Sequence, residues 1–261
     1  MQSWLLIAGG LPLLTLLTLP LVSLVLKTPP LAVLASLGDA TTRQAIALSL
    51  RTSLLTVLVV VLFGTPLAYL LARKRLPGAP LLEVVLDLPT VLPPAVAGLA
   101  LLMAFGRRGL LGAWLAGLGI QLPFTPLAVV MAQTFVAAPY YIKAAALGLS
   151  GVSYELEQAA ALDGATPLET FRYVTLRLAW QGIVGGIALC WARALGEFGA
   201  TIIFAGNLPG RTQTMPLAVY LGFELDLTRA LTLAVILLAI SFVILVAVRT
   251  ILRGYSVESE P

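Results

Sequence analysis

Long runs of residues without a charged side chain are the feature that most restricts the fold of this chain. A transmembrane α-helix needs roughly 20 mostly apolar residues. Five charge-free runs near or above that length cover residues 1–26, 52–72, 88–106, 109–142 and 230–248. A sixth run, 178–207, is interrupted by Arg193 and Glu197. The runs are apolar on every face and do not alternate with a period of two, so a transmembrane β-barrel is a poor fit. The sequence predicts an all-α, polytopic membrane protein with six transmembrane helices.

The composition agrees with that class and removes several kinds of chemistry. Hydrophobic residues make up 59% of the chain and charged residues 11%, whereas about a quarter of a typical soluble domain is charged. Without histidine, imidazole metal sites and histidine-based catalysis are excluded. No lysine follows a glycine, so the chain has no P-loop. We expect no enzyme activity, metal, cofactor or nucleic-acid partner in this chain, and any ATP and Mg²⁺ would be bound by a partner subunit.

A charged segment at 154–177, called the elbow below, separates two of the apolar runs. Helical spacing of its apolar residues is followed by Asp163 and Gly164, which are typical of a helix end. Thr166 and Glu169 then form the pattern of a capping box at the start of a second helix. The elbow is therefore predicted to be helix, glycine, helix. Such an island indicates a soluble partner, although an amphipathic helix that only anchors a loop at the membrane interface is the alternative.

The elbow resembles the cytoplasmic loop of permeases of ATP-binding-cassette (ABC) importers. The family pattern falls on Gln158, Ala159, Ala160, Gly164, Val174 and Leu176. Gln158 stands where the family has glutamate, with Glu157 beside it, and Arg177 stands where the family has proline. The resemblance implies a cytoplasmic coupling loop over 150–178 that docks into a separate ATPase subunit. Its coupling residues would be Glu157, Gln158, Ala159, Ala160, Asp163 and Gly164.

The interrupted run contains the next group of candidate residues. Small residues four apart, such as Gly182 and Gly186, allow helices to approach closely. Arg193 and Glu197 are also four apart, and ionisable residues at membrane depth are costly enough to be functional candidates. They could neutralise each other as an ion pair, or Arg193 could contact an anion directly. Candidates for a translocation path or gate are Arg193, Gly196, Glu197, Gly199, Thr201 and Asn207.

Residues 207–214 combine asparagine, Pro-Gly, arginine and two threonines, which is typical of a tight turn. We expect its N–H and hydroxyl groups to face outward from an extracytoplasmic loop, with Arg211, Thr212 and Thr214 as candidate contacts. The turn could pass on an anion or contact a partner. Arg211 could also be a solvated loop residue, although its guanidinium can offer paired donors to an oxyanion.

Residues 190–220 resemble the fifth-span region of molybdate permeases of the ABC family, a type I importer. The likeness extends from about 45 to 249. It implies a homodimer, two ATPase subunits, an extracytoplasmic molybdate-binding protein and import of molybdate, from which tungstate is hard to separate. Two alternatives within transport are a permease for sulfate or another oxyanion, and an ion-coupled secondary transporter that uses Glu197, Asp87 and Glu83 as a proton path. A membrane scaffold without transport is a third.

Basic residues suggest the orientation in the membrane. Arg73, Lys74 and Arg75 directly follow the second apolar run, and Lys and Arg are enriched in cytoplasmic loops. This triplet places its loop in the cytoplasm. Alternation of six spans then places the elbow and both termini on the same side, in a multi-pass protein of the cytoplasmic (inner) membrane in contact with lipid.

The expected organisation has three parts. An N-terminal transmembrane helix and extracytoplasmic loop cover 1–44, a permease core covers 45–250, and a cytoplasmic tail covers 251–261. Within the core, proline interrupts helical hydrogen bonding. The third span is therefore expected to kink or break near Pro89, Pro93 and Pro94.

Overall fold

The structure is a computed structural model that describes residues 2–74 and 77–256, apart from the side chains of 2–8, 251 and 253–256. Every element in this part of the chain is a helix, as the apolar runs predict. Arg75 and residues 257–261 of the expected tail lie outside the described residues. The helices are α1 (Gln2–Lys27), α2 (Pro30–Gly38), α3 (Ala40–Ala72), α4 (Ala79–Val91), α5 (Pro94–Phe105), α6 (Gly112–Gly117), α7 (Pro126–Ser150), α8 (Tyr154–Leu162), α9 (Pro167–Glu169), the π-helix η1 (Thr170–Thr175), α10 (Leu176–Leu178), α11 (Trp180–Leu195), α12 (Gly199–Phe204), α13 (Met215–Leu225) and α14 (Leu227–Ser256).

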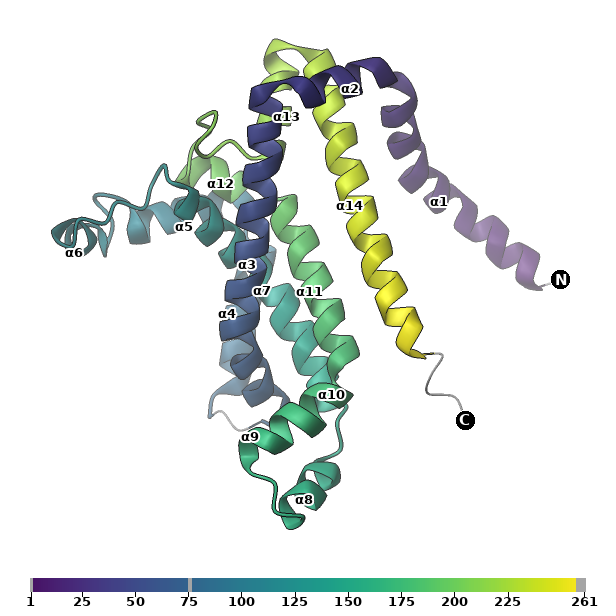
Figure 1. The fold of residues 1–261 in the computed structure, drawn as a ribbon, viewed down its shortest axis with the longest axis vertical. Helices are drawn as coiled ribbons and strands as arrows, with labels where there is room; N and C mark the ends of the chain where they lie inside the picture. The colour runs from purple at the N-terminus through teal and green to yellow at the C-terminus, as the bar shows by residue number, and fades with distance from the viewer. Residues whose placement is uncertain (1, 75–76, 257–261) are drawn as a thin grey trace.

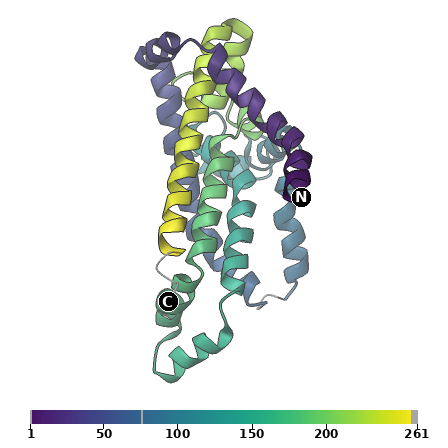
Figure 2. The ribbon, with the colours of Figure 1, turned by 90° about the vertical axis from the view of Figure 1, so that its right-hand side faces the viewer.

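Four long helices, α3, α7, α11 and α14, run along the length of the molecule (Figure 1). The elbow helices α8 to α10 lie at one end, and α2 and α13 lie at the other. A view turned by 90° keeps α14, α11 and the elbow in the same order along the long axis (Figure 2). The end of α3, the elbow and the end of α14 therefore lie toward the same end of the molecule, as alternation of the predicted spans requires.

The α7 helix is the centre of the bundle, because it packs against both α3 and α11. Tyr141 on α7 is fully buried among residues of all three helices. Gly148 of α7 meets Gly182 of α11 so closely that a Cβ on Gly182 would lie 2.6 Å from the Gly148 Cα. A Cβ on Gly186 would lie 3.1 Å from the carbonyl oxygen of Tyr141. The prediction that small residues at 182 and 186 allow close helix contact is confirmed.

Among the described residues, four helices are long and apolar enough to cross a membrane, and up to six spans result if each of two bent helix pairs counts as one. One bent pair is α4 with α5, at 114°. The break falls at Leu92 and Pro93, so the proline-induced break in the third span is confirmed. The prediction for 109–142 is wrong in its start: α6 and a loop come first, and the spanning helix begins at Pro126.

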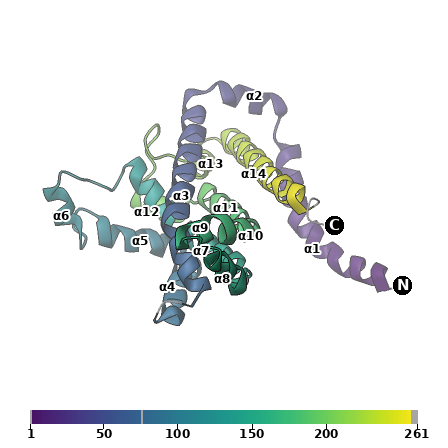
Figure 3. The ribbon, with the colours of Figure 1, turned by 60° about the horizontal axis from the view of Figure 1, so that its bottom comes forward.

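The run predicted over 178–207 also differs from the structure. It forms two separate helices, since α11 ends at Leu195 and α12 begins at Gly199. The second bent pair joins the end of the elbow to α11 at 73°. Viewed from the elbow end, α5 and α6 project to one side of the bundle and α1 to the other (Figure 3).

An ionic contact joins α3 to α14 at the end opposite the elbow. Asp39 caps α3 by accepting a hydrogen bond from the Thr42 N–H at 3.0 Å. The same carboxylate accepts from Arg229 of α14 at 3.0 Å, and Arg229 also donates to the Thr41 hydroxyl. The segment expected as an extracytoplasmic loop therefore contains a helix, α2, and is fixed to the last helix of the chain.

Candidate functional site

The elbow has the local structure that its sequence predicts. The Ser153 hydroxyl accepts a hydrogen bond from the Glu155 N–H at 3.2 Å and begins α8. Gly164 has φ +91° after the helix ends, a backbone conformation that glycine adopts without a steric cost. The Thr166 N–H donates to Glu169 Oε2 at 2.8 Å, and the Glu169 N–H donates back to the Thr166 hydroxyl, which completes the predicted capping box.

The predicted coupling residues differ in exposure. Four of them are exposed, one (Ala160) is half-buried, and one is buried; the exposed ones are Gln158, Ala159, Asp163 and Gly164. The buried one is Glu157, whose carboxylate lies 2.5 Å from Nη2 of Arg73 at the end of α3. Gln158, at the family's glutamate position, therefore faces outward, while Glu157 binds within the chain.

Arg193 and Glu197 form the predicted ion pair, with Nη1 of Arg193 2.7 Å from Oε2 of Glu197. The Glu197 side chain is 1% exposed and that of Arg193 is 26% exposed. The second carboxylate oxygen of Glu197 accepts from the Ala200 N–H at 2.8 Å. Glu197 thus joins the end of α11 to the start of α12, and the side chain of Arg193 stays partly exposed.

Helix α12 lies against α5 through backbone-to-backbone contacts. A Cβ on Gly98 would lie 2.7 Å from the carbonyl oxygen of Ala200, and a Cβ on Gly199 would lie 2.4 Å from the Cβ of Pro94. Thr201 on α12 is fully buried, and its hydroxyl has no hydrogen-bond partner among the described residues. Gly196 is exposed between the two helices. The structure therefore brings together five of the predicted path residues, namely Arg193, Gly196, Glu197, Gly199 and Thr201.

The turn at 207–214 is more closed than predicted. Arg211 is exposed, but Thr212 and Thr214 are 0% and 1% exposed, so the expectation that their hydroxyls face outward is wrong. The Thr212 hydroxyl accepts a hydrogen bond from the Leu208 N–H at 3.0 Å and closes the turn on itself. The sixth path candidate, Asn207, accepts at its side-chain oxygen from Gln213, also at 3.0 Å. Burial of the turn against neighbouring helices replaces the solvent contacts that its composition indicates.

Among the carboxylates considered for a proton path, Glu197 lies apart from Asp87 and Glu83. Glu197 is at the junction of α11 and α12, whereas Asp87 on α4 forms an ion pair with Lys143 on α7. Glu83, Asp87 and Lys143 line a separate surface cavity near the end of α3.

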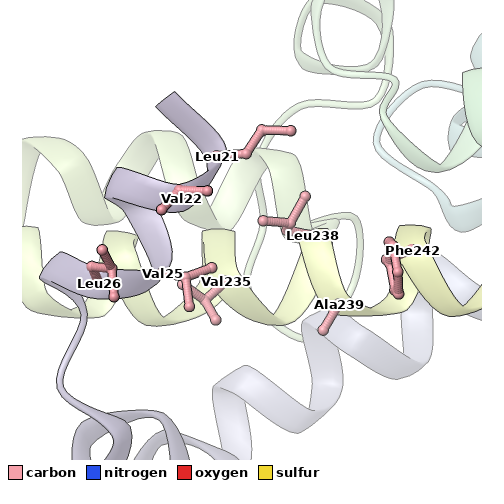
Figure 4. A pocket seen from close by; sticks show the side chains of 8 residues that line it. All are labelled: Leu21, Val22, Val25, Leu26, Val235, Leu238, Ala239 and Phe242. Atoms are coloured by element: carbon pink, nitrogen blue, oxygen red, sulfur yellow. The ribbon is translucent and has the colours of Figure 1, made fainter. Parts of the chain in front are cut away.

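A larger cavity of about 490 Å³ lies between α1 and α14, and its lining is aliphatic and aromatic (Figure 4). Val22 of α1 and Leu238 of α14 are among the side chains that face it. Because the lining offers no polar side chain, this cavity has no donor with which to bind an oxyanion.

The contact between Arg73 and Glu157 is a feature that sequence reasoning misses. The two residues are 84 positions apart, and the sequence indicates Arg73 only as part of a basic cytoplasmic triplet. A basic residue at the end of one span and a glutamate beside a family motif give no local signal of pairing.

The comparisons with known proteins agree with this arrangement. The family described as "Binding-protein-dependent transport system inner membrane component" matches residues 64–256. The chain belongs to this family. It is thus a multi-pass inner-membrane permease of an ABC importer, and the family description implies a substrate-binding partner protein and an ATPase partner.

Three relatives of this permease carry transport names. A probable transport system permease protein NifC of Clostridium pasteurianum is 36% identical, over 91% of this chain and 84% of the relative. The molybdenum transport system permease protein ModB of Escherichia coli K12 is 46% identical, over 68% and 78%. The sulfate transport system permease protein CysT of Salmonella typhimurium is 34% identical, over 90% and 87%.

A solved structure supports the fold of the permease. A bacterial ABC transporter involved in the import of the acidic polysaccharide alginate superposes with a TM-score of 0.72 at 17% identity, covering 97% of this chain and 96% of that one. The similarity extends over nearly the whole chain. The expected type I importer permease fold is therefore confirmed.

Proposed function

We propose that this permease imports molybdate, with tungstate as an equivalent substrate, and performs no covalent chemistry of its own. The 46% identity to a molybdenum permease, together with the match of residues 190–220 to the molybdate permease pattern, carries the proposal. Family membership supports translocation that depends on a binding protein. The molybdate specificity of that binding protein and the assembly of two copies of this chain are part of the proposal.

The elbow is proposed as the docking site of a cytoplasmic ATPase that binds ATP and Mg²⁺. The exposed residues of α8 and of the turn after it, including Gln158 and Asp163, offer a surface at the end of the molecule. Arg73, which follows α3 and contacts Glu157 of the elbow, and Lys74 beside it then also lie in the cytoplasm, in agreement with the positive-inside rule. The proposal also places both termini on the cytoplasmic side. In this proposal, closure of the ATPase dimer moves the elbow.

The path is proposed to pass the junction of α11 and α12. Arg193 is the ionisable side chain there that keeps part of its surface open, while Glu197 offsets its charge. A partly neutralised guanidinium can attract a dianion without holding it tightly, which suits transport better than storage. Arg211 is exposed on the turn that leads from α12 to α13 and could meet the delivered anion.

The test is to reconstitute the permease in liposomes with its ATPase and binding protein, and to measure ATP hydrolysis with molybdate, tungstate and sulfate. We expect stimulation by molybdate and tungstate and little by sulfate. Stimulation by sulfate alone would assign the chain to sulfate import, the alternative that the 34% identity to CysT supports. Uptake by the chain alone under a proton gradient would instead indicate ion-coupled transport.

A further inference from the structure

Arg73, at the end of α3, contacts two separate parts of the elbow region. Its Nη2 lies 2.5 Å from Oε1 of Glu157 on α8. Its Nη1 donates to the carbonyl oxygen of Val152, between α7 and α8, at 3.0 Å. The side chains of Arg73 and Glu157 are 9% and 7% exposed. A guanidinium can donate in two directions at once from a planar fork, which an ammonium cannot do in the same geometry.

Glu157 extends this contact to the second half of the elbow. Its Oε1 also accepts a hydrogen bond from the hydroxyl of Thr175, on η1, at 2.7 Å. Thr175 is fully buried. One carboxylate therefore joins three segments: the end of α3, the first elbow helix α8 and the π-helix that leads to α11.

An aromatic contact reinforces the same junction. The guanidinium of Arg73 lies 5.7 Å from the ring centroid of Tyr69, one turn earlier on α3. The Tyr69 ring packs edge-on against Phe171 of η1, with centroids 5.1 Å apart and the planes at 74°. The end of α3 is thus attached to both halves of the elbow by side chains that come from two successive turns.

A buried ion pair is weak evidence for stability, because desolvation offsets much of its attraction. Its better-attested role is to fix one geometry of the groups that it joins. Gln158 and Asp163 of the elbow are exposed, whereas Glu157 is buried. A partner that moves α8 would therefore displace α3 directly through the buried contacts of Arg73 and Tyr69, in addition to the packing of α3 against α7 and α11.

We propose that Arg73 is a positioning residue for coupling, which holds the elbow to the end of α3 so that the two move together. This inference rests on the proposed function, in which an ATPase drives the elbow. Arg73 has no contact with the transported anion in this proposal. It determines how much of the elbow's displacement reaches α3.

The experiment compares variants of the permease in proteoliposomes with the ATPase and binding protein. Arg73→Met and Glu157→Gln remove the pair, and Lys74→Met is the matched control, because Lys74 is the exposed neighbouring cation. Measured quantities are the ATPase that co-purifies, the rate of ATP hydrolysis, and molybdate uptake per ATP hydrolysed. The ratio of uptake to hydrolysis separates coupling from a general loss of folded protein.

We expect Arg73→Met and Glu157→Gln to retain the ATPase and its hydrolysis while uptake per ATP falls about twofold to thirtyfold, the range typical of mutations that change coupling between sites. The double variant should lose no more than the worse single variant, because the two residues act as one pair. Lys74→Met should keep the original ratio. An unchanged ratio in Arg73→Met, with uptake and hydrolysis falling together or not at all, would overturn the proposal.

Milder variants decide the question if Arg73→Met does not fold. Arg73→Lys keeps the charge but loses the planar fork that donates to Val152 and Glu157 together, and Thr175→Val keeps the shape but removes one hydrogen bond to Glu157. Both should lower uptake per ATP, and a normal ratio in both would overturn the proposal. If no ATPase co-purifies with the unaltered permease, the proposed function fails first, so the two failures are distinguishable.

Discussion

Oε2 of Glu197 lies 2.7 Å from Nη1 of Arg193, while Oε1 of the same carboxylate accepts the Ala200 N–H at 2.8 Å. A single buried side chain therefore fixes both the last turn of α11 and the first turn of α12. Its two roles can be separated by substitution, since a glutamine retains an acceptor for the amide but cannot neutralise the guanidinium.

Replacing Glu197 should destabilise the permease, and alanine should do so more than glutamine. Removing one partner of a buried ion pair typically costs about 3–5 kcal/mol, and we expect Glu197→Ala to approach this because it also leaves the Ala200 amide unpaired. Glu197→Gln should cost less, since an amide oxygen can still accept that bond. Thermal unfolding in detergent measures both, with the exposed Glu155→Gln as control. Equal midpoints for the alanine and glutamine variants would contradict the second role.

The contact of α5 with α12 should not tolerate a methyl group. A Cβ on Gly98 would lie 2.7 Å from the Ala200 carbonyl oxygen and 2.8 Å from the Ile203 Cβ. Overpacking of this kind typically costs about 1–3 kcal/mol, so Gly98→Ala should lower the unfolding midpoint and reduce uptake. Gly185→Ala on α11 is the matched control, because a methyl group at that position would meet no neighbouring atom within 4 Å. A drop of equal size in the control would refute the packing explanation.

Gly164 should be sensitive to side-chain shape through its backbone alone. It has φ +91° and no neighbouring atom within 4 Å of a Cβ. A left-handed backbone conformation costs an L-residue roughly 1–2 kcal/mol of conformational free energy, and a β-branched residue no less. Asparagine adopts this conformation more readily. We expect Gly164→Val to reduce ATPase co-purification and uptake, and Gly164→Asn to retain most of both. Full coupling in the valine variant would show that the turn is not needed.

The contact of Asp39 with Arg229 should persist over the whole physiological pH range. Hydrogen bonds from the Thr41 hydroxyl and the Thr42 N–H, and the charge of Arg229, lower the pKa of Asp39 from 3.8 to about 2. A lowered pKa stabilises the fold above the ordinary pKa, and this contribution is lost as the pH falls from about 4 to about 2.

This pH dependence can be measured by thermal unfolding in detergent at several pH values. Asp39→Asn should unfold at a lower temperature than the unaltered permease at pH 7, and the difference should shrink as the pH approaches 2. Asp163→Asn, at an exposed carboxylate on the elbow, is the control. A difference that stays constant down to pH 2 would show that the Asp39 charge does not contribute.

Local signals predict much of the fold. Charge-free runs locate α1, α3 and α14, because hydropathy reports lipid-compatible length directly. Thr166 and Glu169 predict the second elbow helix, since capping depends on residues three apart. The pairing of Arg193 with Glu197 is also predictable, because one helical turn separates them.

Other features cannot be predicted from hydropathy or from the spacing of neighbouring residues. The charge-free run 109–142 contains a loop that hydropathy does not reveal. The start of α7 inside this run is marked by Thr125, whose hydroxyl accepts a hydrogen bond from the Ala128 N–H at 3.2 Å, and by Pro126 at the first helical position. The burial of Thr212 and Thr214 depends on helices distant in sequence. The Arg73–Glu157 contact depends on how α3 and α8 pack, which a motif cannot report.

The α3 helix contains 33 residues. At 1.5 Å per residue it measures about 50 Å, which exceeds a hydrocarbon core of about 30 Å. The charge-free part of α3, residues 52–72, measures about 30 Å by the same rise and matches that core, so the preceding turns with Arg43 and Arg51 extend beyond it. Asp39 therefore lies well outside the hydrocarbon on one side of the membrane, whereas Arg73 lies at its edge on the other.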